Sequence, residues 1–178
     1  METLEAIKTR RSIRKYKKEK IPNDILKELL TAGMSGPTGG NGEPWQFIIL
    51  NDPEILQKIP NVPSGAPFVS DAPLAILVCG DLKEYPGLKE EFLDVWVIDC
   101  SIAAQNILLA AHSKGLGAVW TGVYPMEERV SGLKALLELP ENIIPLVLIV
   151  IGYPAEKLPV LDRYNESKVH YNTFGKEK

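Results

Sequence analysis

The chain has 178 residues, of which 45% are hydrophobic and 24% charged, and its formal net charge is -3. This length suits one domain, and the composition excludes collagen-like and disordered chains. With two cysteines and two histidines, the chain offers little for a disulfide framework, a zinc site or a histidine-dependent triad. We therefore expect one folded domain without a metal site.

The apolar segments indicate a cytoplasmic protein. The longest strongly apolar stretch, residues 143–151, is less than half of the ~20 residues that a membrane-spanning helix needs. Residues 1–8 are mixed polar and lack the apolar stretch of a signal peptide. Cys79 and Cys100 lie inside apolar segments, which favours reduced, buried thiols over a disulfide.

In the first half of the chain, hydrophobic periodicity and turn residues predict five elements and one loop. In chain order they are a helix over 4–9, a helix over 24–34 capped by Asn23, a loop over 35–42, a strand over 45–50, a helix over 53–59 and a strand over 74–79. The loop, with the sequence SGPTGGNG, lacks the Gly-Lys-Ser/Thr ending of a phosphate-binding P-loop. ATP hydrolysis therefore loses its main support.

In the second half, a polar excursion over 81–91 precedes a long helix over 92–113 that Gly115 closes. A strand over 116–120, a helix over 126–137 and a strand over 146–151 follow. The long helix is apolar on nearly all sides, so we expect a second subunit to cover it together with its own sheet. The tail from 152 to 178 either hangs free or wraps another surface. These elements predict an α+β sandwich of sheet and helices.

A basic run over residues 8–20, KTRRSIRKYKKEK, contains eight Lys or Arg and one acid, whereas the rest of the chain is acidic. Such a run indicates an anionic partner: nucleic acid, a membrane surface or a phosphate-bearing cofactor. Arginine forks and a hydroxyl group suit phosphate oxygens, whereas the lysines of the run are expected to form a solvated face. The candidate phosphate ligands are Arg10, Arg11, Ser12 and Arg14.

Two further features fit a flat, phosphate-bearing ligand, and one histidine does not take part. The loop residues Pro37, Thr38, Gly39 and Gly40 would let backbone approach a ligand closely. Arg163 adds an isolated late base. His112 has no matched serine or cysteine motif and is interpreted as a core or helix-end histidine. A dinucleotide fingerprint is also missing, because the glycines at 115 and 117 precede a strand.

The combination of these pieces resembles the FMN-dependent nitroreductase family over about residues 4–174. Its parts, in order, are RRSIRKY at 10–16, the Gly-Pro-rich loop before PWQF at 44–47, AQN at 104–106, GLGAVWTG at 115–122 and IGYPA at 151–155. The resemblance implies a sandwich with a central, mostly antiparallel sheet flanked by helices. It also implies an intertwined homodimer of single domains, 1–178, in which an arm from about residue 152 wraps the partner subunit.

By its motifs, the resemblance implies a role for each candidate residue. Arg10, Arg11 and Ser12 would hold the FMN phosphate and ribityl chain, and Arg163 would add to the phosphate grip. Arg14 would reach the N1 and O2 edge of the flavin, where a cation stabilises the charge of the reduced ring. The loop residues Pro37, Thr38 and Gly39 would lie against the ring across the dimer interface. The backbone of Thr121 and Gly122 would lie near N5.

The implied activity is ping-pong transfer of a hydride from NADH or NADPH to FMN and then to a small acceptor such as a nitroaromatic or a quinone. No side chain need act as acid, base or nucleophile. The residues expected near the acceptor are Gly40, Asn41 and Glu43. Where some members carry a second phosphate-binding base, this chain has Leu161.

Three questions stay open at the level of the sequence. Glu43 replaces a glutamine of many members and is shared with the deiodinase-like branch, so a reductive dehalogenase or another flavin-processing activity is an alternative. A second alternative is a non-enzymatic polyanion-binding protein, which the acidic remainder of the chain disfavours; we expect neither a nucleic-acid nor a membrane partner. The segment over 81–91 is short for a lid above the substrate.

Overall fold

A computed structural model describes residues 1–62, 66–83 and 95–176 of the chain. At its centre lies a four-stranded sheet in the order β1-β2-β4-β3, with every neighbouring pair antiparallel. The strands are β1 Trp45–Leu50, β2 Leu74–Asp81, β3 Gly117–Gly122 and β4 Ile143–Gly152. The predicted α+β sandwich with a mostly antiparallel central sheet is confirmed.

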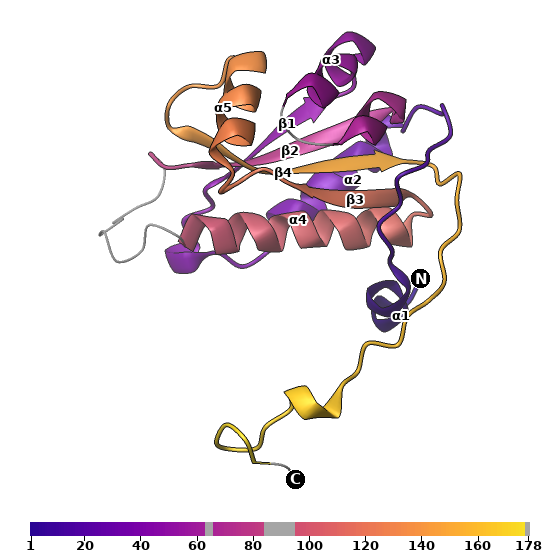
Figure 1. Cartoon of the computed structure of the whole chain (residues 1–178), viewed down its shortest axis with the longest axis vertical. Coiled ribbons are helices and arrows are strands. Elements are labelled where there is room, and N and C mark those ends of the chain that lie inside the picture. The colour runs from indigo at the N-terminus through magenta and orange to yellow at the C-terminus, as the bar shows by residue number, and fades with distance from the viewer. Residues whose placement is uncertain (63–65, 84–94, 177–178) are drawn as a thin grey trace.

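Helices cover both faces of this sheet (Figure 1). The α-helices of the described residues are α1 Thr3–Thr9, α2 Asn23–Met34, α3 Pro53–Lys58, α4 Val95–Ser113 and α5 Glu127–Leu136, and α1 lies beyond the sheet in contact with α4. Helices α2 and α4 pack together on one face, and α3 and α5 lie on the other. The central strands β2 and β4 are buried on both faces, which explains their continuous apolar sequences.

Helix α4 is the main helix of the core, and the structure explains its apolar sequence in part. It packs against α2 and all four strands, and eight of its residues are buried. By length and composition it could cross a membrane, yet it lies against the sheet. Ile98 nevertheless stands 59% exposed on its outer side. The sheet and α2 therefore cover only part of an almost wholly apolar helix.

Both ends of α4 bear on the predictions. Just after the C-terminal end of α4, Gly115 adopts a positive φ of 77°. The N–H of Gly115 donates to the carbonyl of His112, and the N–H of Leu116 donates to the carbonyl of Ala111. This is the Schellman arrangement that glycine permits, and it confirms the predicted cap. The predicted start at residue 92 and most of the polar excursion over 81–91 lie outside the described residues.

Some predicted boundaries were wrong. Asn23 is the first residue of α2 rather than its cap; Pro22 takes the cap position and no side chain caps the helix. Strand β3 begins at Gly117 and runs two residues beyond the predicted end, which places Thr121 and Gly122 in the sheet. Strand β4 begins at Ile143, three residues early. Pairing with neighbouring strands extends these elements beyond their most apolar parts.

After α1, the chain crosses one end of the sheet. Ser12 forms a parallel bridge with Ala118 of β3, and Tyr16 forms an antiparallel bridge with Pro154, just after β4. The N–H of Ile13 donates to the carbonyl of Ala118 at 3.1 Å. The basic run is thus fixed to the backbone where β3 starts and β4 ends.

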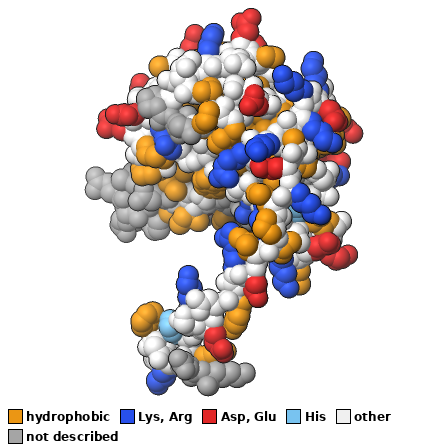
Figure 2. Space-filling model, turned by 45° about the vertical axis from the view of Figure 1, so that its right-hand side comes forward, with side chains coloured by type: hydrophobic (Ala, Val, Ile, Leu, Met, Phe, Trp, Pro, Cys, Tyr) orange, Lys and Arg blue, Asp and Glu red, His pale blue; other side chains and the backbone are white. Residues whose placement is uncertain are grey.

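The tail beyond Pro154 leaves the body of the molecule in an extended path (Figure 1). Figure 2 shows it standing clear of the body, with hydrophobic side chains open to solvent. Phe174 is 91% exposed and Tyr164 is 74% exposed. Large apolar side chains that are exposed together are typical of an interaction surface, and the outer part of the tail presents such a surface.

Candidate functional site

The candidate phosphate ligands lie where α1 ends. Arg10 is the residue that follows α1, and its N–H still bonds to the carbonyl of Ala6. Ser12 sits two residues on, held by its bridge to Ala118. Arg10, Arg11 and Ser12 are all half-buried. The local structure therefore fixes three consecutive residues of the predicted cluster beside the first residues of β3.

The electrostatics of this cluster favour an anion. Burial lowers the pKa of Arg10, and the neighbouring positive charges of Arg11 and Arg163 lower it further. Among the residues that the structure describes, no carboxylate pairs with any of these three arginines. Like charges held together cost free energy that a bound anion would relieve. The tail thus brings Arg163 to the cluster, although more than 140 residues of sequence separate them.

Arg11 directs its side chain at backbone carbonyls. Its Nε donates to the carbonyl of Pro159 at 2.8 Å, and Nη2 lies 3.5 Å from that of Leu161. Nη1 donates to the carbonyls of Lys8 and Arg10 at 3.0 and 2.6 Å. The guanidinium has five N–H donors. Four of them are thereby directed at main-chain oxygens.

Arg14 belongs to the same segment, but its side chain lies elsewhere. Its guanidinium carbon is 5.8 Å from the centre of the Phe68 ring, a cation–π distance. Its backbone N–H donates to Oε1 of Glu156 at 2.7 Å. The segment is therefore anchored at Arg14 while the side chain stays exposed.

The loop that carries the other predicted contacts is pinned to the first turns of α4. The N–H of Gly39 donates to both carboxylate oxygens of Asp99, at 3.0 and 3.1 Å. Thr38 Oγ1 accepts the N–H of Glu43 at 3.3 Å. Residues 39–41 form a short 3-10 turn, whereas Pro37 is exposed.

The exposed part of this loop lies near the start of α4, whereas the arginine cluster (Arg10, Arg11 and Arg163) follows α1, which contacts the end of α4. Gly40, Asn41 and Glu43 all adopt positive φ and are exposed. At the far end of α4, Thr9 Oγ1 and His112 Nε2 lie 2.8 Å apart, which ties α1 to that helix. At 1.5 Å per residue, Asp99 and His112 are ~20 Å apart along the axis. One chain alone does not bring the loop and the arginine cluster together.

Thr121 and Gly122 end strand β3. The hydroxyl of Thr121 is buried and has no hydrogen-bond partner among the described residues. The carbonyl of Gly122 accepts Nη1 of Arg129 from α5 at 2.9 Å. Four residues of strand separate Thr121 from Gly117, or ~13 Å. Thr121 and Gly122 thus lie at one end of the edge strand β3, and Ala118, to which Ser12 bridges, lies near the other end.

Sequence reasoning missed Asp99 and Glu156, which organise the predicted site residues. Asp99 is 3% exposed and is the only acid in residues 95–113. A lone charge in an apolar helix was the available signal, because a buried carboxylate needs hydrogen-bond partners. Glu156 gave no such signal, since the tail around it is polar.

The cysteines take no part in this arrangement. Both are free and buried, as predicted. Burial raises the pKa of Cys79 to about 12 and also raises that of Cys100. Both thiols therefore stay protonated at neutral pH and lack the thiolate needed for nucleophilic chemistry.

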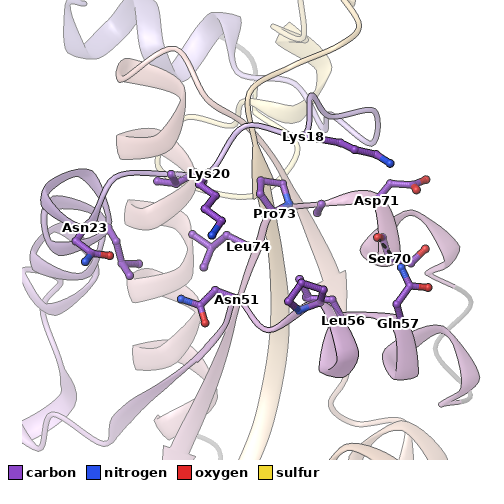
Figure 3. Close-up of a pocket in the computed structure, with 14 residues that line it drawn as sticks. Lys18, Lys20, Asn23, Asn51, Leu56, Gln57, Ser70, Asp71, Pro73 and Leu74 are labelled. Carbon is purple, nitrogen blue, oxygen red and sulfur yellow. Dashed lines mark hydrogen bonds between the residues drawn. The ribbon is translucent and has the colours of Figure 1, made fainter.

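A cavity of about 520 Å³ lies away from these residues. Figure 3 shows Lys18 and Lys20 along one side of it and Asn51 and Gln57 on the other. It opens where β1 ends and β2 begins, across the sheet from β3. None of the predicted site residues lines it.

Comparisons with known proteins identify the family. The family model described as the nitroreductase family matches residues 7–94 and 63–153. A Methanothermobacter thermautotrophicus protein named as an NADH dehydrogenase/NAD(P)H nitroreductase is 50% identical over 96% of this chain and 86% of its own length. A Bacillus subtilis FMN reductase [NAD(P)H] is 30% identical over 97% of this chain and 74% of its own length.

A solved structure agrees in both fold and sequence. The FMN-dependent nitroreductase from Clostridium difficile R20291 superimposes with a TM-score of 0.86 at 32% identity, covering 96% of this chain and 99% of that one. The arginine segment, residues 10–17, and the loop after α2 thus occupy a fold shared over nearly the whole chain. The chain belongs to the nitroreductase family.

Proposed function

We propose that the protein is an FMN-dependent NAD(P)H oxidoreductase of the nitroreductase type. The observation that carries this proposal is the cluster of Arg10, Arg11 and Arg163, in which burial and mutual repulsion call for an anion. The names of two relatives, an FMN reductase and an FMN-dependent nitroreductase, support the same cofactor.

The residues of the cluster fit the phosphate of FMN. Arg10 and Arg163 supply positive charge and N–H donors, and Ser12, whose backbone bridges to Ala118 of β3, supplies a hydroxyl group. Arg14 would stabilise negative charge at the N1 and O2 edge of the flavin. The buried hydroxyl of Thr121 has no hydrogen-bond partner within the described part of the chain, so a ligand at this end of β3 would complete its hydrogen bonding.

When bound, FMN would accept a hydride from NADH or NADPH and pass electrons to a nitroaromatic, quinone or similar small acceptor in a second half-reaction. The protein's own side chains then bind and orient. They need not act as acid, base or nucleophile, which agrees with the protonated cysteines. The exposed residues Gly40, Asn41 and Glu43 would line the approach of the acceptor.

The working unit in this proposal is an intertwined homodimer with two sites. The loop and the arginine cluster lie at opposite ends of α4, so a site containing both needs a second chain related by a two-fold axis. Ile98 on the outer side of α4 and the apolar side chains of the tail provide surface for that contact. The tail from about residue 152 would wrap the partner subunit.

An absorbance spectrum of the purified protein, before and after anaerobic addition of NADH or NADPH, tests this proposal. We expect a yellow protein with one FMN per chain whose flavin absorbance bleaches on adding the donor. Comparison of the two donors at equal concentration gives the preference for NADH or NADPH. A colourless protein that takes up no added FMN would contradict the proposal.

A further inference from the structure

The arginine segment and the start of the tail run side by side in one antiparallel register. The N–H of Lys17 donates to the carbonyl of Tyr153 at 2.8 Å, and the N–H of Ala155 donates to that of Lys15 at 2.9 Å. The bridge between Tyr16 and Pro154 lies between these bonds. Residues 14–17 and 153–156 thus form a short ladder at the edge of the core.

Side-chain hydrogen bonds also join the two segments, and each segment contributes one of the side chains. Glu156 of the tail accepts the N–H groups of Arg14 and Lys15 with a single oxygen, Oε1, at 2.7 and 3.1 Å. Arg11 of the arginine segment donates to the carbonyl of Pro159 at 2.8 Å and approaches that of Leu161. Each segment therefore holds the other through one long charged side chain and main-chain groups.

The position of Arg163 follows from this arrangement. It stands two residues beyond Leu161, the last carbonyl that Arg11 approaches, and Arg10 is the neighbour of Arg11 in sequence. Most of the N–H donors of Arg11 are already directed at carbonyls, so its guanidinium is poorly placed to serve as a phosphate ligand as well. Holding the tail here brings the charge of Arg163 to Arg10.

We propose that Arg11 and Glu156 are positioning residues, which hold the tail in register along the arginine segment and thereby place Arg163 beside Arg10 for the phosphate of FMN. The inference rests on the proposed function. It assigns Arg11 a different task from its neighbour Arg10: Arg10 acts on the phosphate, whereas Arg11 acts through Arg163.

The phosphate contribution can be isolated by comparing FMN with riboflavin, which lacks the phosphate. The ratio of their dissociation constants is measured on the apo-protein by quenching of flavin fluorescence. We expect Arg11→Ala and Arg163→Ala each to reduce the preference for FMN by about tenfold, the loss of one charge-assisted contact. The double variant should be no worse than Arg163→Ala alone, because Arg11 acts through Arg163. Arg10→Ala is the control and should reduce the preference further in the Arg163→Ala background.

Two conservative substitutions separate positioning from charge. Arg11→Lys keeps the charge, but one ammonium group cannot reach the carbonyls of Lys8 and Pro159 together, so it should behave like Arg11→Ala. Glu156→Gln keeps an oxygen for both N–H groups and should retain or raise the preference for FMN. Glu156→Ala removes a negative charge near arginines, which by charge alone would favour FMN; positioning predicts a weaker preference instead.

The inference would be overturned if the losses of FMN preference in Arg11→Ala and Arg163→Ala multiply in the double variant, or if Arg11→Ala leaves the ratio of dissociation constants unchanged. Full recovery of the FMN preference in Arg11→Lys, or tighter FMN binding by Glu156→Ala, would also overturn it. Each of these outcomes leaves the proposed function standing. A wild-type protein that binds neither flavin would overturn both. Thermal unfolding of each apo-variant shows that the protein is folded; if Arg11→Ala does not fold, Arg11→Lys and the two Glu156 variants decide the question.

Discussion

Arg10 and Arg11 are neighbours of the same type, yet the structure gives them different surroundings. Arg10 lies half-buried among like charges, whereas Arg11 is directed at carbonyls of the helix end and the tail. Residue type alone suggests equal roles for the two. The difference arises because side-chain donors bond to the acceptors within reach, and the path of the tail decides which acceptors those are.

Replacing Arg10 tests the phosphate site directly. Arg10→Ala should weaken FMN binding by about 10- to 100-fold, because a charge-assisted hydrogen bond contributes about 1.5 to 3 kcal/mol. Riboflavin binding should change little, since riboflavin carries no phosphate. Fluorescence titration of both flavins checks this expectation. Lys18→Ala is the control, because it also removes one positive charge but at an exposed residue outside the cluster. Equal weakening of both flavins would remove Arg10 from the phosphate site.

His112 couples the same region to pH. Burial, then the charges of Arg10 and Arg11, lower its pKa from the ordinary value of 6.5, while Glu5 opposes the shift. The unfolded chain therefore binds a proton more readily than the folded chain, so this contribution to stability is present above that value and is lost as the pH falls towards the lowered pKa.

We accordingly expect the free energy of unfolding of the wild-type apo-protein to decline more than that of His112→Gln between about pH 7 and about pH 5.5. Urea denaturation at each pH measures both. Both proteins contain the same carboxylates, so the difference between their pH profiles reports the contribution of His112. Parallel pH profiles would show that His112 does not contribute.

At the scale of elements, β3 holds the arginine segment by close backbone approach. A Cβ added to Gly117 would lie 2.6 Å from Cγ2 of Ile13, whose side chain is buried. This contact leaves no room for a methyl group without displacing the segment that carries Ser12. Gly122, on the same strand, has no such constraint, since its nearest neighbour, Cε of Met126, would be 3.6 Å away.

Gly117→Ala should therefore destabilise the apo-protein by about 1 to 3 kcal/mol, the usual cost of overpacking a filled site. Gly122→Ala should change the stability by much less, and it serves as the matched control on one strand. Urea denaturation of the two apo-variants provides the comparison. Equal stability of both would mean that the segment moves away at no cost.

At the scale of the whole molecule, the chain leaves apolar surface uncovered. The outer side of α4 has a shallow apolar hollow lined by residues 97–98, 101–102 and 105–106, and the tail adds large exposed side chains. Exposed apolar area of this kind favours association. A dimer would cover both surfaces and bring each loop to the opposite arginine cluster.

Ile98→Lys places a charge on this outer side, and we expect it to shift the protein to a monomer and to abolish FMN retention. Ile98 is 59% exposed in the single chain, so the fold itself should persist. Analytical ultracentrifugation measures the assembly and circular dichroism the fold, with Lys58→Glu on α3, at the other face of the sheet, as the control. A wild-type monomer that still retains FMN would contradict the proposed two-chain site.

Prediction from the sequence succeeded where the physical signal is local. Every predicted helix that falls on described residues was found, because hydrophobic periodicity and turn residues act within one element. The cap at Gly115 was predicted from its need for positive φ. Ends of strands were predicted less well, since pairing partners set them, as the extension of β3 to Gly122 shows.

The candidate site divides in the same way. The motifs placed Arg10, Arg11, Ser12 and Arg163 in one function, and the structure brings Arg163 close enough to Arg10 for its charge to lower the pKa of Arg10. They gave no sign of Glu156, whose importance depends on two N–H groups more than 140 residues away in sequence. Nor did they show the bonds of Arg11 to the tail.

The sequence by itself determined the family, the antiparallel α+β fold and the reduced, buried cysteines, because composition, motif order and periodicity are properties of the chain in any conformation. Only the tertiary structure decided that the loop and the arginine cluster lie at opposite ends of α4, ~20 Å apart along the helix axis. It also decided that Arg11 holds the tail. Distances and hydrogen-bond partners between remote segments depend on the path of the folded chain, and local sequence does not encode that path residue by residue.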